Sequence, residues 1–97
     1  MTQDVYETDF LTELTLLRND PELIDKVRPQ AEIGNPHAQY AMGLIYAEGR
    51  GVKVNKRLAY IWLSRAIAQG DLDASLLRDM LLNDMSAQEV EQAEREV

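Results

Sequence analysis

The sequence is short of the residues that build covalent or metal-dependent sites. Its 97 residues include no cysteine and one histidine, His37. Without cysteine the chain forms no disulfide, thiolate metal site or thiol nucleophile. A lone histidine does not support a zinc site, because such sites need several nitrogen or sulfur ligands. We therefore predict neither a metal nor a cofactor, and we expect His37 to face solvent from the first turn of a helix.

Long apolar runs are also missing. No segment approaches the roughly 20 apolar residues that a membrane span requires. The acidic N-terminal residues lack the basic-then-apolar order of a secretory signal. A hydrophobic content of 45% is ordinary for a folded chain. We therefore expect one soluble, cytoplasmic domain over residues 1–97.

Basic residues are scarce outside the middle of the chain. The net charge is -7, yet residues 49–70 hold five bases and no acid. A charge of this sign repels nucleic acid and anionic membranes, so neither is an expected partner. The basic stretch is interpreted either as a solvated surface or as a patch that meets an acidic partner. Its bases are Arg50, Lys53, Lys56, Arg57 and Arg65.

Catalytic motifs are absent as well. Gly49 and Gly51 do not begin a dinucleotide fingerprint, since Val54 stands at the third glycine position and no strand precedes them. No serine has the flanking glycines of a nucleophile elbow. A hydrolase hypothesis would rest only on the number of carboxylates, without a constellation to support it. We predict that the chain is not an enzyme.

What the sequence does contain is helical periodicity. Apolar residues recur at intervals of three and four, as in the stripe Tyr6, Phe10, Leu14 and Leu17, and no segment alternates like a strand. Capping residues and prolines or glycines separate the segments. Six helices with short links predict an all-α fold of about three antiparallel helical hairpins. After the first, they are expected near residues 21–33, 36–48, 55–69, 71–83 and from 86 onward, with a kink or early end at Pro29.

The residues that end one helix and begin the next repeat along the chain. A helix-ending glycine, a capping side chain and a small residue recur after 36 residues, and so do the helix starters Asn19 and Asn55. A two-helix unit at such a period is typical of an α-solenoid. The recurring positions are Gly34, Asn35 and Ala38, then Gly70, Asp71 and Ala74.

Residues 31–74 resemble one complete Sel-one-like repeat, a relative of the tetratricopeptide repeats. The resemblance implies a short right-handed α-solenoid that binds other proteins. Flanking hairpins depart from the pattern, since the first lacks the glycine loop and the third has Asp79 where the repeat has Gly43. We expect them to be degenerate caps. Matching positions are Ala38-Gln39-Tyr40-Ala41-Met42-Gly43-Leu44-Ile45-Tyr46, Gly49-Arg50-Gly51-Val52, Ala59, Trp62-Leu63, Ala66 and Gln69-Gly70.

One candidate binding face lies on the helix expected over residues 36–48. Tyr40, Leu44 and Ala47 fall opposite its other apolar side. They either pack against the next helix of the solenoid or line a concave groove, as the resemblance implies. Arg50 and Lys53 follow directly, and these five residues are the predicted partner-binding set.

A second apolar face lies on the helix expected over residues 71–83, whose leucines point nearly all round. We expect the last helix to cover them; the alternative is a partner or self-association surface. These residues are Leu72, Leu76, Leu77, Met80, Leu81 and Leu82.

Two functions fit these observations. The first is an adaptor or regulatory module that binds a peptide or protein through a concave helical face. The second is a small acidic immunity or inhibitor protein that neutralises a basic toxin or enzyme, because acidic flanks would speed its capture.

Overall fold

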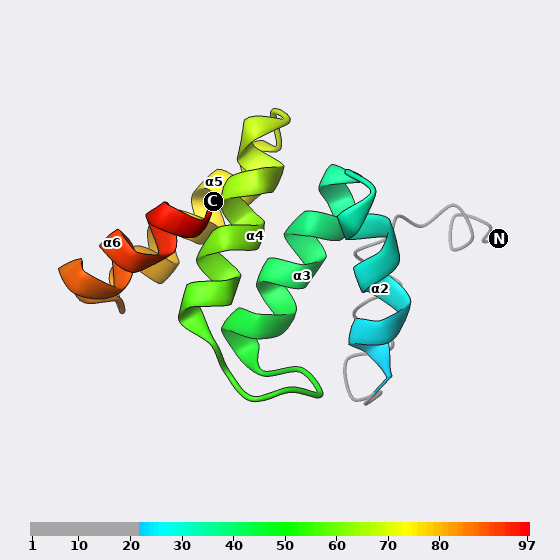
Figure 1. Ribbon diagram of the computed structural model, residues 1–97, viewed down its shortest axis with the longest axis horizontal. Helices are drawn as coiled ribbons and strands as arrows, with labels where there is room; N and C mark the ends of the chain where they lie inside the picture. The colour runs from blue at the N-terminus through cyan, green and yellow to red at the C-terminus, as the bar shows by residue number, and fades with distance from the viewer. Residues whose placement is uncertain (1–21) are drawn as a thin grey trace, which may run out of the picture.

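Helices make up most of residues 22–97, the part of the chain that the computed structural model describes (Figure 1). These residues contain no strand, so the all-α prediction is confirmed for them. The helix expected around Tyr6 lies outside this range. Pro29 sits inside its helix, which continues beyond it. The helices are α2 (Leu23–Glu32), α3 (Pro36–Glu48), α4 (Lys56–Ala68), α5 (Leu72–Leu82) and α6 (Ala87–Glu96).

Four of these helices begin at a side-chain cap. The side chains of Asn35, Asn55 and Asp71 accept hydrogen bonds from backbone N–H groups in the first turns of α3, α4 and α5. At α6, Ser86 and Glu89 form a reciprocal capping box. These bonds satisfy donors that the helix leaves unpaired. The helix starts expected at residues 36, 55, 71 and 86 thus agree with the observed starts to within one residue.

The 36-residue repeat is visible in the backbone. Gly34 and Gly70 end their helices with φ of +103° and +92°, a region that favours glycine. Ala38 and Ala74 follow at equivalent positions, and both are fully buried. The two helix junctions thus repeat in conformation and burial as well as in sequence.

The closest packing in the repeat joins α3 to α4. A β-carbon on Gly43 would lie 2.5 Å from Cδ2 of Leu63 and 3.4 Å from the backbone oxygen of Ala59. Leu63 is fully buried and has little room to move. Glycine at position 43 is therefore what allows the two helices to approach this closely.

Two apolar cores lie side by side, and α4 contributes to both. Tyr46 packs against each of them. Successive helices pack as in a short helical-repeat solenoid, in agreement with the predicted fold class. The first core holds Leu23, Ile24, Val27, Ala31, Ala38, Ala41, Met42, Ile45 and Trp62. The second holds Ala59, Tyr60, Ile61, Leu63, Ala66, Ala74, Leu81 and Ala93.

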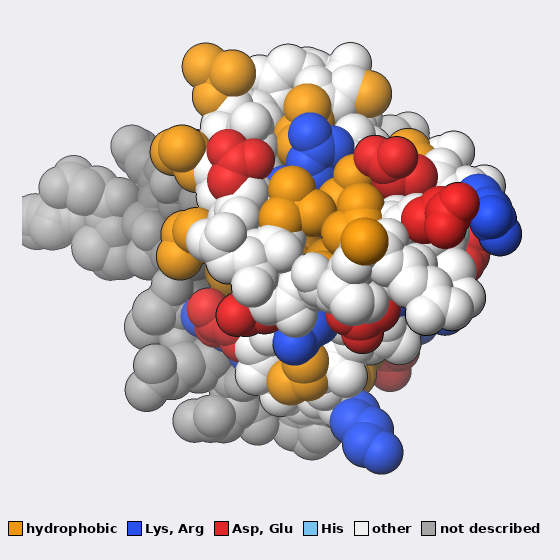
Figure 2. Space-filling view, turned by 90° about the vertical axis from the view of Figure 1, so that its left-hand side faces the viewer, with side chains coloured by type: hydrophobic (Ala, Val, Ile, Leu, Met, Phe, Trp, Pro, Cys, Tyr) orange, Lys and Arg blue, Asp and Glu red, His pale blue; other side chains and the backbone are white. Residues whose placement is uncertain are grey.

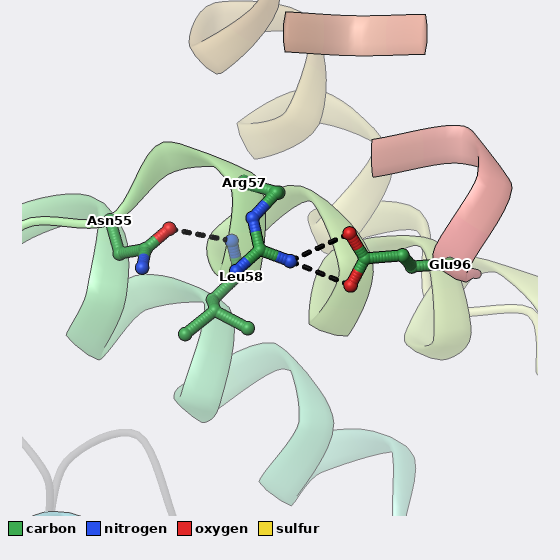
Figure 3. Close-up of polar contacts among 4 residues, drawn as sticks. All are labelled: Asn55, Arg57, Leu58 and Glu96. Atoms are coloured by element: carbon green, nitrogen blue, oxygen red, sulfur yellow. Dashed lines mark hydrogen bonds and ion pairs between the residues drawn. The ribbon is translucent and has the colours of Figure 1, made fainter. Parts of the chain in front are cut away.

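Helix α6 packs chiefly against α4 rather than against α5. One guanidinium nitrogen of Arg57 in α4, Nη1, donates to both carboxylate oxygens of Glu96, at 2.6 and 2.7 Å (Figure 3). Tyr60 of α4 donates a hydrogen bond to Glu94 Oε2 at 2.7 Å. Ala93 of α6 is fully buried in the second core. These contacts hold α6 against α4.

This position of α6 overturns one expectation in part: Leu81 is buried and Leu77 and Leu82 pack against the second core, but three other apolar residues of α5 stay uncovered. Leu72, Leu76 and Met80 of α5 are 78%, 66% and 65% exposed, so the last helix does not cover them. At the position equivalent to Gly43, α5 carries the exposed Asp79, and α6 makes its contacts with α4 instead.

Trp62 provides a test of the core. Its side chain is only 8% exposed and belongs to the first core. Trp62→Ala should lower the free energy of unfolding by ~3–5 kcal/mol, measured by chemical denaturation. The control is Arg65→Ala, which removes the exposed side chain whose guanidinium lies 4.9 Å from the Trp62 ring centroid; it should cost about 1 kcal/mol or less. A loss below about 1 kcal/mol for Trp62→Ala would contradict the core assignment.

Gly43 provides a test of the α3–α4 contact. Gly43→Leu should unfold or loosen the protein, because overpacking of this kind costs ~1–3 kcal/mol or more. His37→Leu, on the exposed side of the same helix, is the matched control and should leave the denaturation midpoint nearly unchanged. Equal midpoints for both variants would refute the close-packing argument.

Candidate functional site

The predicted binding residues occupy one side of α3 and the loop that follows it. Tyr40, Leu44 and Ala47 are all half-buried, and Tyr40 and Ala47 pack against the second core. Arg50 is partly buried in the loop, and Lys53 is exposed. The structure thus gives Tyr40 and Ala47 a packing role toward the solenoid and leaves part of Leu44 accessible. We call Tyr40, Leu44 and Ala47 the α3 face.

The loop beside the α3 face carries less free positive charge than the sequence predicts. Nε of Arg50 donates to Glu48 Oε1 at 2.7 Å, and Nη2 lies 2.6 Å from the same oxygen. Glu48 lies one residue before residues 49–70, the stretch without acids, so the charge of that stretch alone does not indicate the pair. Arg50 is therefore neutralised locally, and Lys53 is the exposed cation of the predicted set.

Acids at the start of α5 also act on the α3 face. The pKa of Tyr40 is raised, first by burial and then by the negative charges of Asp73, Asp71 and Glu48, against a smaller opposing effect of Arg50. The Tyr40 hydroxyl therefore stays protonated at neutral pH, as a hydrogen-bond donor in an acidic surrounding.

A hydrogen-bond network ties three helix ends together near this face. Nε2 of Gln69 donates to the backbone oxygen of Gly34 and to Oε1 of Gln39, both at 2.8 Å. Nε2 of Gln39, which is buried, then donates to the backbone oxygen of Ala31 at 3.1 Å. Both glutamines belong to the repeat pattern of the sequence, but the pattern alone does not indicate this role. They fix the ends of α2 and α4 relative to α3.

An open hollow of about 420 Å³ lies between the starts of α3 and α5. Its lining includes Pro36 and His37 on one side and Leu72 and Asp73 on the other. His37 is exposed, as predicted. The hollow offers an apolar wall beside a carboxylate, which suits a side chain of mixed character more than a catalytic reaction.

A polar cluster joins α4, α5 and α6. Arg78 Nη1 donates to Ser64 Oγ at 3.1 Å, and its guanidinium lies 5.4 Å from the Tyr60 ring centroid. The Tyr60 pKa is raised, mainly by burial and then by the hydrogen bond to Glu94. Figure 2 faces this end of the molecule and shows apolar side chains gathered among charged ones. The cluster connects three helices and lacks a nucleophile–base pair.

Two further observations concern residues 22–97 alone. Within them no group of three or more histidine or carboxylate side chains is placed to hold a metal ion. Nor does this range contain a helix whose length and apolar character would let it cross a membrane.

The raised Tyr60 pKa gives a pH test. A folded-state pKa above the reference value of 10.0 stabilises the fold below that pH, and this contribution is lost as pH rises through the folded pKa. In NMR titrations of ring-labelled tyrosine, we expect Tyr60 to titrate above its ordinary range. Glu94→Gln should lower the Tyr60 pKa, because it removes the negative charge that the hydroxyl faces. An ordinary pKa for Tyr60 would contradict the observed burial and bonding.

Comparisons with known proteins agree with this geometry. The Sel1 repeat family matches residues 36–71. The alginate biosynthesis protein AlgK of Azotobacter vinelandii is 29% identical over 80 residues, which is 81% of this chain and 16% of AlgK. The chain therefore spans a small part of that relative's length. No solved structure matches. The resemblance read from the sequence is confirmed for residues 36–71, which match the Sel1 repeat and span α3, α4 and the capping residue of α5.

Proposed function

We propose that this chain is a protein-interaction module, an adaptor or regulatory scaffold that binds a peptide or protein through the α3 face. Sel1 repeats generally mediate protein–protein interaction. The observation that carries the proposal here is the partly exposed Leu44, held beside Tyr40 on a helix whose other side is core. We also infer that the segments flanking the repeat act as caps.

The proposed role is that of a scaffold rather than an enzyme. A Sel1 repeat is a platform for binding, and the polar cluster at Tyr60 serves to join helices. The chain is also similar to the alginate biosynthesis protein AlgK. Because this chain covers only 16% of AlgK, the similarity is not extended to alginate biosynthesis itself.

The chemistry of the α3 face sets the expected ligand. Leu44 and the accessible part of Tyr40 offer apolar contact, and Lys53 offers one exposed cation. Apolar burial would supply most of the affinity, since an exposed ion pair contributes only ~0.2–1 kcal/mol. The ligand is therefore a segment with apolar anchors and few acids, whose binding weakens only modestly with salt.

Binding by the α3 face is tested with Tyr40→Ala combined with Leu44→Ala. The tagged chain and the double variant are used in parallel to capture partners from the native host, with identification by mass spectrometry. We expect a partner that the parent binds and the variant loses, while helical circular dichroism is retained. Ile33→Ser, which changes an exposed apolar residue elsewhere, should keep the partner.

Two results would contradict the proposal. An unfolded double variant, together with an unfolded Leu44→Ala single variant, would mean that these residues belong to the core. A folded double variant that retains full binding would move the site away from the α3 face.

A further inference from the structure

The outer face of α5 exposes three large apolar side chains in a row. Leu72, Leu76 and Met80 recur at every fourth position, so they form one ridge that runs about 12 Å along the helix. Each is at least 65% exposed. Single exposed apolar residues are ordinary, but a continuous row marks a binding surface. We call these three residues the α5 stripe.

Acids border the α5 stripe on both sides. At about 100° per residue, Asp79 falls about 20° outside Leu72 and Asp73 about 20° outside Met80. Both carboxylates are exposed. The single base of α5, Arg78, is directed away from the stripe, toward Ser64 and the Tyr60 ring. The exposed side of α5 is therefore an apolar row between two negative charges, with no base on that helix to offset them.

The surface continues beyond the helix at its N-terminal end. Leu72 and Asp73 also line the hollow of about 420 Å³ shared with Pro36 and His37. A partner that covers the α5 stripe would reach this hollow with its next side chain. Like the α5 stripe, the hollow places an apolar wall beside a carboxylate.

Charge decides between the possible occupants. A second copy of the chain would bring its own α5 acids against these acids, and each copy carries a net charge of -7. An anionic membrane would meet the same repulsion. A helix with apolar residues on one side and lysine or arginine on both edges would bury the stripe and place its cations beside Asp73 and Asp79.

We propose that the α5 stripe docks a basic amphipathic helix of a partner protein. The partner helix presents apolar side chains at intervals of three and four between two rows of basic residues. Apolar burial provides the affinity, and the acids select the sign of the charge. This surface shares no residue with the α3 face, although Asp73 at its edge also acts on Tyr40.

The probe is a synthetic helix-forming peptide with leucines at those intervals and lysines along both edges. Its binding to the full chain is measured by fluorescence anisotropy. A matched peptide carries glutamate in place of each lysine. We expect saturable binding of the lysine peptide alone. Leu76→Ser with Met80→Ser should weaken it about tenfold or more, because the central apolar contacts are lost.

Matched variants separate this surface from the others. Asp73→Asn with Asp79→Asn should weaken binding of the lysine peptide by about threefold or more and reduce its salt dependence. Ile33→Ser and Leu44→Ala should each change the affinity for the lysine peptide by less than about twofold. Ile33 is an exposed apolar residue outside the α5 stripe, and Leu44 belongs to the α3 face. Circular dichroism checks that each variant stays folded.

Several results would overturn the proposal. They are equal binding of the glutamate peptide, unchanged binding after Leu76→Ser with Met80→Ser, and loss of binding with Leu44→Ala alone. A dimer seen in analytical ultracentrifugation and abolished by Leu76→Ser would assign the stripe to a second copy instead. Because Leu44→Ala reports on the α3 face separately, failure of either proposal is recognised without affecting the other.

Discussion

The contact between α3 and α4 at Gly43 is the constraint on which the rest of the molecule depends. A β-carbon at this position would meet the buried side chain of Leu63, so glycine sets how closely the helices pack. That distance lets α4 carry residues of both cores, with Trp62 in the first and Leu63 in the second. Moving α4 outward would therefore disturb both cores at once, because interiors at native density have little free volume.

Once α4 is fixed, the remaining helices are arranged around it. The Gln39–Gln69 network holds the end of α4 to the end of α2, and Glu94 and Glu96 attach α6 along the other side of α4. The surface pair at Glu96 contributes little energy by itself. The burial of Ala93 is the stronger effect, and the polar contacts give that burial its register.

Local chemistry was largely predictable from the sequence. Helix starts at Asn35 and Ser86 depend on bonds within three residues, so pattern and propensity identify them. The placement of α6 was not predictable in this way, because it rests on contacts such as Tyr60–Glu94, 34 residues apart. The pairing of Arg50 with Glu48 could not be predicted from the charge of residues 49–70, because Glu48 lies just outside that stretch.

The departure of the last two helices from the repeat pattern has a consequence for the surface. In the full repeat, a glycine at position 43 brings two helices together and buries the side chains between them. Asp79 stands at the equivalent position of α5, and α6 packs on α4. Leu72, Leu76 and Met80 remain exposed on α5, between the exposed carboxylates of Asp73 and Asp79. A loss of repeat regularity at one helix thus creates an accessible apolar surface, while the core built around α4 remains intact.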